Sequence, residues 1–252
     1  MKFWLLLYLL TFGLFIGCKK GTPLVFSMES FTENSLELCK NIGCPDVTIS
    51  YAVAQGDSEA TKKINSEIKS YIISTLHIED ESESDAKTIS EAVEGFIKTY
   101  RMDSADFPDM SAEYFAEINV SNSYSSKELV SFQLEQLLYT GGAHGYQNIS
   151  FQSFNPNSGE VIFTEDLFNN IEAFTNLAEN KFRESNSISE NESINSTGFW
   201  FEDDLFYLPE TIGITATDII LIYNQYEIAS YADGSIELEI PVEEVSKYLS
   251  YK

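Results

Sequence analysis

The chain is poor in histidine, cysteine and positive charge. Its 252 residues include two histidines, three cysteines and 15 Lys and Arg residues, against 40 Asp and Glu residues, so the formal net charge is −25. This excess of negative charge disfavours binding to nucleic acid and to anionic lipid surfaces, and it favours cationic partners by long-range attraction. The simpler explanation of the charge is that it keeps a surface protein soluble.

The scarcity of histidine and cysteine argues against a metal site. A site built on Cys39 and Cys44 needs two more ligands, and the two histidines, His77 and His144, lie far away without ligand spacing of their own. The fixed pattern of alternate ligands in a calcium-binding loop is also absent. We therefore expect no metal and no cofactor.

The longest apolar segment lies at the N-terminus, from residue 3 to residue 16, and follows Lys2. This segment is too short and wrongly flanked for a stable membrane span, and it is typical of a secretory signal peptide, here residues 1–17.

The last four residues of the signal peptide and Cys18 read LFIGC, which resembles a bacterial lipobox, where cleavage before Cys18 leaves a lipidated N-terminus. Phe15 departs from the commoner leucine at its position. The alternatives are a plain signal peptide that is cut elsewhere, or an uncleaved anchor. Lipidation of Cys18 predicts a protein anchored in the bacterial cell envelope, on the periplasmic or surface side, and Lys19 favours the outer membrane.

The two cysteines that remain, Cys39 and Cys44, form an even pair in an oxidising compartment. We expect a disulfide between them. Residues 19–35 show no sustained hydrophobic period, so we expect residues 18–43 to be a tether that follows the lipid.

Hydrophobic periodicity predicts an α+β fold, with antiparallel sheets and helices packed on one side. The expected domains are residues 44–145 and residues 146–252, which form two associated sub-domains. Strands are expected at 46–54, 114–124, 129–139, 146–155, 160–163, 206–208, 218–227 and 235–240, and helices at 57–75, 89–100, 171–183 and 242–249.

Two phrases of the sequence resemble a known family. They are TGGAHGYQNISFQSFNPNSGEVIFTEDLF, from residue 140, and IYNQYEIASYADGSIELEIPVEEVSKYL, from residue 222. They resemble the paired domains of unknown function in the ectodomain of RsiV-type anti-sigma factors; related domains precede the catalytic domain of PdaC-type peptidoglycan deacetylases. The resemblance covers about residues 44–250 and implies an α+β fold of two portions that pack together.

The RsiV-type ectodomain binds lysozyme, and this binding triggers proteolytic release of a sigma factor. We find no cytoplasmic sigma-binding segment, no internal transmembrane helix and no deacetylase domain in the sequence. We therefore expect neither anti-sigma signalling nor deacetylation, and we expect the accessory module alone.

His144 lies between glycines, in the stretch Gly141, Gly142, Ala143, His144 and Gly145. It has no nucleophile motif of the G-x-S-x-G kind beside it. We interpret it as a turn residue placed by glycines with unusual backbone angles. The alternative is a ligand-binding or catalytic histidine with a partner from elsewhere in the fold.

A run of aromatic and acidic residues follows the polar segment SNSISENESINST, which reads as an exposed excursion. The run is a candidate partner patch, because exposed aromatic rings rimmed by carboxylates suit a cationic protein or a sugar ring. The alternative is that the run lies half in the core and half at the surface, with its carboxylates exposed to solvent. The residues are Phe199, Trp200, Phe201, Glu202, Asp203 and Asp204.

The sequence therefore predicts a lipid-anchored binding protein of the bacterial cell envelope, with no catalytic activity. Its expected partner is a cationic protein such as lysozyme, or peptidoglycan. The alternatives are a cell-wall-active enzyme or deacetylase accessory that uses His144 with a carboxylate, and a structural lipoprotein that supports the envelope.

Overall fold

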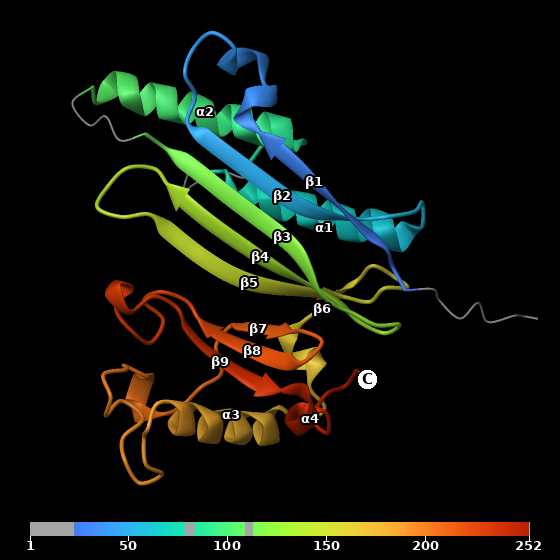
Figure 1. Ribbon diagram of the computed structural model, residues 1–252, viewed down its shortest axis with the longest axis vertical. Coiled ribbons are helices and arrows are strands. Elements are labelled where there is room, and N and C mark those ends of the chain that lie inside the picture. Colours follow the sequence, from blue (N-terminus) through green and yellow to red (C-terminus); the bar gives the residue numbers. More distant parts are fainter. Residues whose placement is uncertain (1–22, 79–83, 109–112, 252) are drawn as a thin grey trace, which may run out of the picture.

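The structure is a computed structural model that describes residues 23–78, 84–108 and 113–251. The predicted signal peptide, residues 1–17, and Cys18 lie outside these ranges. Figure 1 shows two units, one above the other, and each unit combines a sheet with helices. Among the described residues, none of the helices has the length and apolar character needed to cross a membrane.

The first unit is a six-stranded sheet whose strands are neighbours in space in their sequence order. Its elements are β1 (Phe26–Thr32), β2 (Asp46–Ala54), α1 (Glu59–Thr75), α2 (Ile89–Asp106), β3 (Phe115–Ser125), β4 (Val130–Tyr139), β5 (Tyr146–Phe154) and β6 (Val161–Ile162). All neighbouring strands are antiparallel except β2 and β3. These two run parallel because α1 and α2 cross over between them. β3 to β6 form an antiparallel meander, in agreement with the antiparallel pairing that the sequence predicts.

β1 contradicts the predicted tether over residues 18–43, because Phe26–Thr32 pairs with β2 along its whole length. The hydrophobic pattern of the sequence does not indicate this strand, because β1 lies at the edge of the sheet. Four of its seven residues, Ser27 to Ser30, are exposed, so apolar residues do not alternate with polar ones. The sheet thus begins before the predicted domain.

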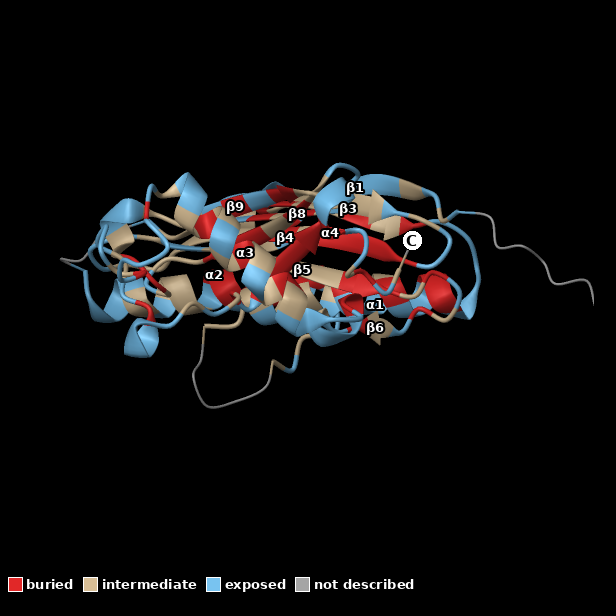
Figure 2. Ribbon diagram, turned by 90° about the horizontal axis from the view of Figure 1, so that it is seen from below, coloured by how far each residue is buried: buried red, intermediate tan, exposed pale blue. Residues whose placement is uncertain are grey.

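α1 and α2 cover one face of the sheet with the apolar stripes that the sequence predicts. Ile64 and Ile72 of α1, and Val93 and Ile97 of α2, are fully buried. Full burial of one such side chain stabilises the fold by about 1.5–3 kcal/mol. In Figure 2 the buried segments, in red, belong to the strands and to parts of the helices, while many of the loops are exposed, in pale blue.

The second unit is a three-stranded antiparallel sheet packed on one long helix. Its elements are α3 (Ile171–Ser185), β7 (Thr211–Ile214), β8 (Asp218–Tyr223), β9 (Ile236–Pro241) and α4 (Val242–Val245). Aromatic rings fill its core: the ring centroid of Phe182 lies 5.3 Å from that of Phe201 and 5.9 Å from that of Tyr223, in edge-to-face geometry. The α+β fold of two associated sub-domains is confirmed.

The two units join at β5. The side chain of Asn224, directly after β8, takes the place of a neighbouring strand: its Nδ2 donates to the Ile149 carbonyl at 2.9 Å, and its Oδ1 accepts from the Ile149 N–H at 3.0 Å. Gly213 of β7 lies so close to Phe151 that an added Cβ would be 2.4 Å from the ring. The predicted boundary after residue 145 falls between β4 and β5, two paired strands of one sheet.

Candidate binding surfaces

The predicted disulfide is confirmed. Cys39 and Cys44 are bonded, with their Cα atoms 5.6 Å apart. Arg101 of α2 reaches this loop: its Nη2 donates to the Leu38 carbonyl at 3.0 Å and lies 3.4 Å from Cys44 Sγ. The disulfide thus fixes the connection between β1 and β2 against α2.

The turn between β4 and β5 has the glycine geometry that the sequence predicts. Gly141 and Gly142 have φ angles of 96° and 92°, a region that favours glycine. A Cβ on Gly145 would lie 3.0 Å from the Leu138 carbonyl oxygen. The turn carries His144 to the surface, where its ring is exposed.

His144 stacks on Tyr231, in the loop between β8 and β9. The two ring centroids are 3.9 Å apart with an interplanar angle of 23°. The hydroxyl of Tyr226, in the same loop, lies 3.4 Å from His144 Nε2, and the Tyr231 hydroxyl donates to the Gly145 carbonyl at 3.1 Å. The two phrases that carry the family resemblance therefore meet in space, and His144 connects the two units.

Tyr226 is held in an unusual conformation. Its φ angle of 69° is rare for a residue with a side chain, and its side chain is 58% exposed. The loop is fixed beside it, because the Asn224 N–H donates to Glu227 Oε2 at 2.9 Å. Burial of Glu227, together with the nearby charge of Glu210, raises the pKa of the Glu227 carboxyl, while backbone hydrogen bonds oppose the shift.

The predicted partner patch is wrong for Phe201, which is 2% exposed in the aromatic core of the second unit. Phe199 is half-buried against the same core. Trp200 points outward, with 47% of its surface exposed, and its backbone N–H donates to the Ile228 carbonyl at 3.0 Å. Glu202, Asp203 and Asp204 are exposed, so the half-core reading describes the run.

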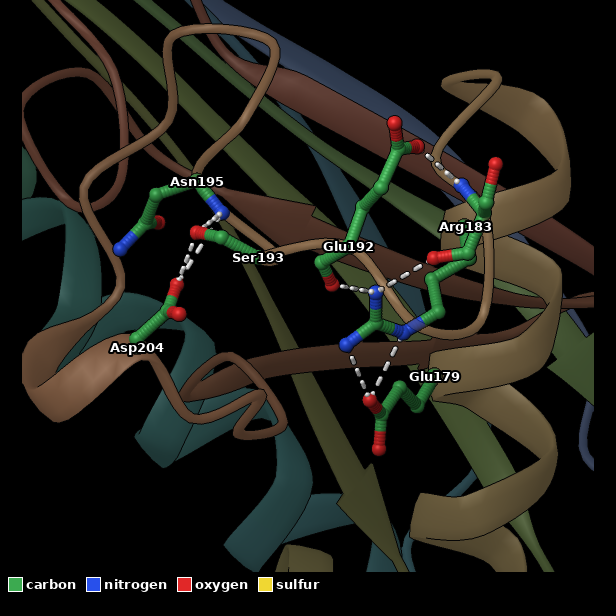
Figure 3. Close-up of polar contacts among 7 residues, drawn as sticks. Glu179, Arg183, Glu192, Ser193, Asn195 and Asp204 are labelled. Carbon is green, nitrogen blue, oxygen red and sulfur yellow. Dashed lines mark hydrogen bonds and ion pairs between the residues drawn. The ribbon is translucent and has the colours of Figure 1, made fainter.

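The polar segment before this run is folded rather than an excursion. Ile188 and Ile194 within it are buried. Figure 3 shows the contacts that hold it: Arg183 of α3 pairs with Glu179 at 2.8 Å and donates to the Glu192 carbonyl at 3.0 Å. Further along, the Ser193 hydroxyl donates to Asp204.

Three loops meet at one end of the molecule, on the left in Figure 1: residues 140–146, 198–210 and 224–234. They contain no Lys or Arg. We call this surface the aromatic end and define it by its aromatic side chains, His144, Trp200, Tyr207, Tyr226 and Tyr231. The same loops contain six carboxylates: Glu202, Asp203, Asp204, Glu210, Glu227 and Asp233.

A second surface is the face of the first sheet opposite α1 and α2, which we call the open face. The strand register sets two rows of side chains across β1 to β5. One row is Thr32, Thr48, Glu117, Leu137 and Gln147, and the other is Ser30, Ser50, Asn119, Glu135 and Ile149. These side chains are exposed or half-buried, and a groove of about 500 Å³ runs between β2 and β5.

Two features bear on the alternative of a catalytic or metal-binding site: the contacts of His144 and the grouping of possible metal ligands. The contacts of His144 are with Gly145, Tyr226 and Tyr231 and include no carboxylate. Among the residues of known placement, no group of three or more His, Cys, Asp or Glu side chains could hold a metal ion. Glu165 and Asp166 lie in one exposed helical turn after β6, apart from both surfaces.

The fold and these surfaces define a class of protein: an α+β module of two units that are in contact at β5, with exposed loops at one end. Residues 39–147 match the family model described as deacetylase PdaC, and residues 160–243 match that of a protein of unknown function, DUF3298. The matches confirm the paired domains that the sequence phrases resemble. They indicate a cell-envelope protein of unknown function. No curated protein matches the chain.

Two solved structures are similar over nearly the whole chain. A member of the DUF3298 family from Bacteroides fragilis is 23% identical, with a TM-score of 0.67 and coverage of 90% of this chain and 94% of that one. A DUF3298 family protein from Pseudomonas aeruginosa is 18% identical, with a TM-score of 0.59 and coverage of 92% and 96%. At these identities the likeness shows the fold alone.

Proposed function

We propose that this protein is a lipid-anchored, non-catalytic binding protein of the cell envelope that binds a cationic protein such as lysozyme through the aromatic end. The observation that carries the proposal is the composition of the three loops there, which combine six carboxylates with exposed aromatic rings and contain no Lys or Arg. Lipidation of Cys18, with the outer membrane favoured, belongs to the same proposal.

The chemistry of the aromatic end suits Lys and Arg side chains. The faces of Trp and Tyr attract a cation within about 6 Å of the ring centroid. Trp200 and Tyr226 expose 47% and 58% of their surface, so a partner can reach them. The net charge of −25 would speed the encounter with a cationic protein, and salt would screen this attraction.

The loops are held in place before a partner arrives. The stack of His144 on Tyr231 and the hydrogen bond from the backbone N–H of Trp200 to the Ile228 carbonyl tie the three loops together. A surface that is ordered in advance loses less conformational entropy on binding. This supports a recognition surface rather than a flexible rim.

The test is the affinity of the purified protein for egg-white lysozyme at low and high salt. We expect Trp200→Ala and Tyr226→Ala each to weaken binding by about tenfold, as loss of an interface anchor does. Phe163→Ala is the matched control, since Phe163 is 61% exposed and lies outside the three loops.

Two double variants distinguish the effect of the carboxylates at the aromatic end from the effect of the overall net charge. Glu202→Gln with Asp203→Asn should weaken binding more than Glu165→Gln with Asp166→Asn, although both double variants lose two charges. Absence of binding at low salt, or equal losses in both double variants, would contradict the proposal.

Peptidoglycan is the second ligand class. A surface that binds peptidoglycan needs hydroxyl, amide and apolar groups along an extended path, and a high density of negative charge matters less. The open face offers such groups.

A further inference from the structure

We infer that the open face of the first sheet binds a linear polysaccharide chain, at a site separate from the aromatic end. The inference rests on the second ligand class of the proposed function and assigns it a site. The groove of about 500 Å³ adjoins a second hollow of about 480 Å³, and Thr48, Glu117 and Leu137 line both.

The shape of this surface suits an extended ligand. Each of the two side-chain rows crosses five strands. Strands are spaced by about 4.8 Å, so the rows are roughly 19 Å long. No Lys or Arg stands in either row, so no long basic side chain lies across the groove.

Several polar groups in the groove are free to bond a ligand. Within the described part of the chain, no hydrogen bond is found for the side chains of Thr48, Ser50, Glu117 and Gln147. These groups supply both donors and acceptors, and sugar hydroxyls need both. Removal of a hydroxyl or amide from such a position leaves the fold intact, since no internal bond is lost.

One carboxylate of the groove is held in a fixed position. Gln133 Nε2 donates to Glu135 Oε1 at 2.6 Å, and Asn119 Nδ2 donates to Glu135 Oε2 at 3.3 Å. Two neutral donors thus orient the Glu135 carboxylate without neutralising it. An oriented acceptor of this kind suits a pair of sugar hydroxyls.

Apolar groups lie between the polar ones. Leu137 and Ile149 line the groove, and Phe115 lines the adjoining hollow. The ring of Phe115 stacks on that of Tyr139, with centroids 5.9 Å apart and an interplanar angle of 23°. Pyranose rings have apolar C–H faces beside their hydroxyls, so a surface that mixes apolar and polar groups fits a sugar chain. It fits a protein partner less well, because the core of a protein interface is largely apolar.

The experiment measures binding of two soluble oligosaccharides, the hexamers of N-acetylglucosamine and of glucose, both β-1,4-linked, to the purified full chain by calorimetry. We expect at least one to bind. Ser50→Ala and Gln147→Ala should each weaken its binding about threefold to tenfold, as expected for one lost hydrogen bond.

The matched control is Asn148→Ala. Asn148 neighbours Gln147 on β5 and lies on the face that α1 and α2 cover, so its loss should leave binding unchanged. Absence of binding of both hexamers at millimolar concentration would overturn the inference. So would binding that Ser50→Ala and Gln147→Ala leave intact. Lysozyme affinity of the same variants reports separately on the aromatic end and should not change.

Discussion

The contact between Asn224 and β5 predicts that one side chain couples the two units. Asn224→Ala removes both hydrogen bonds to the Ile149 backbone, at 2.9 and 3.0 Å. It also removes the weaker bond from Nδ2 to Thr211 Oγ1 at 3.3 Å. At this half-buried junction the substitution leaves the Ile149 N–H without its partner, whereas the Ile149 carbonyl keeps the hydrogen bond from Thr211 Oγ1 at 3.2 Å.

The cost follows from these bonds. Each hydrogen bond contributes about 0.5–1.5 kcal/mol net, and leaving a buried partner unsatisfied costs more. Because the junction is only half-buried, we expect Asn224→Ala to lower the free energy of unfolding by about 2 kcal/mol. Asn148→Ala, on the same strand and without a side-chain bond, should change it by less than about 0.5 kcal/mol.

Urea denaturation followed by two probes measures this coupling. Trp200 is the only tryptophan after residue 17, so its fluorescence reports on the second unit, while circular dichroism reports on both. We expect the two transitions to coincide in the unsubstituted protein and to separate in Asn224→Ala. An unfolding free energy for Asn224→Ala equal to that of Asn148→Ala would refute the assigned role of the junction.

Three further variants test individual contacts by thermal or urea denaturation. His144→Ala should cost about 0.5–1.5 kcal/mol through the lost stack on Tyr231, and His144→Phe should cost less. Gly213→Ala should cost about 1–3 kcal/mol because its Cβ meets Phe151, and Gly213→Ala with Phe151→Ala should cost less than the sum of the two single variants. Burial holds the folded-state pKa of Glu227 above the ordinary 4.5, so ionisation destabilises the fold. Glu227→Gln should therefore gain stability relative to the unsubstituted protein as pH rises from about 4 to 7, and a constant difference would contradict this.

Local patterns in the sequence were enough to predict most of the fold. The apolar stripe that includes Ile64, Ile68 and Ile72 predicts α1, and alternation predicts the long strands β3 and β4. Short connections after residue 112 predict the meander. Each of these elements is buried on one side, and burial on one side requires apolar residues at regular intervals, which can be recognised in the sequence.

Elements without one-sided burial were missed. β1 is exposed at the edge of the sheet, and all four residues of β7 are buried, so neither strand alternates. The sequence predicts a strand at residues 206–208, whereas the strand lies at Thr211–Ile214. The segment before Phe199 looks polar, although its two isoleucines, Ile188 and Ile194, anchor it in the core.

The candidate sites depended on contacts between distant residues, which a single sequence does not record. The turn role of Gly141 and Gly142 was predictable from local chemistry. The stack of His144 on Tyr231 was not predictable, because the two residues lie far apart in the sequence. Gly145, which follows His144 and accepts a hydrogen bond from Tyr231, is 86 residues away from it. The open face was also missed, since its rows combine single residues from five strands.

Hydrogen exchange with and without lysozyme tests the central claim most directly, that the three loops of the aromatic end form one binding surface. We predict that saturating lysozyme slows amide exchange in residues 140–146, 198–210 and 224–234 together and leaves the helices α1 and α2 unchanged. Protection confined to other segments, or in one of the three loops without the others, would contradict the account.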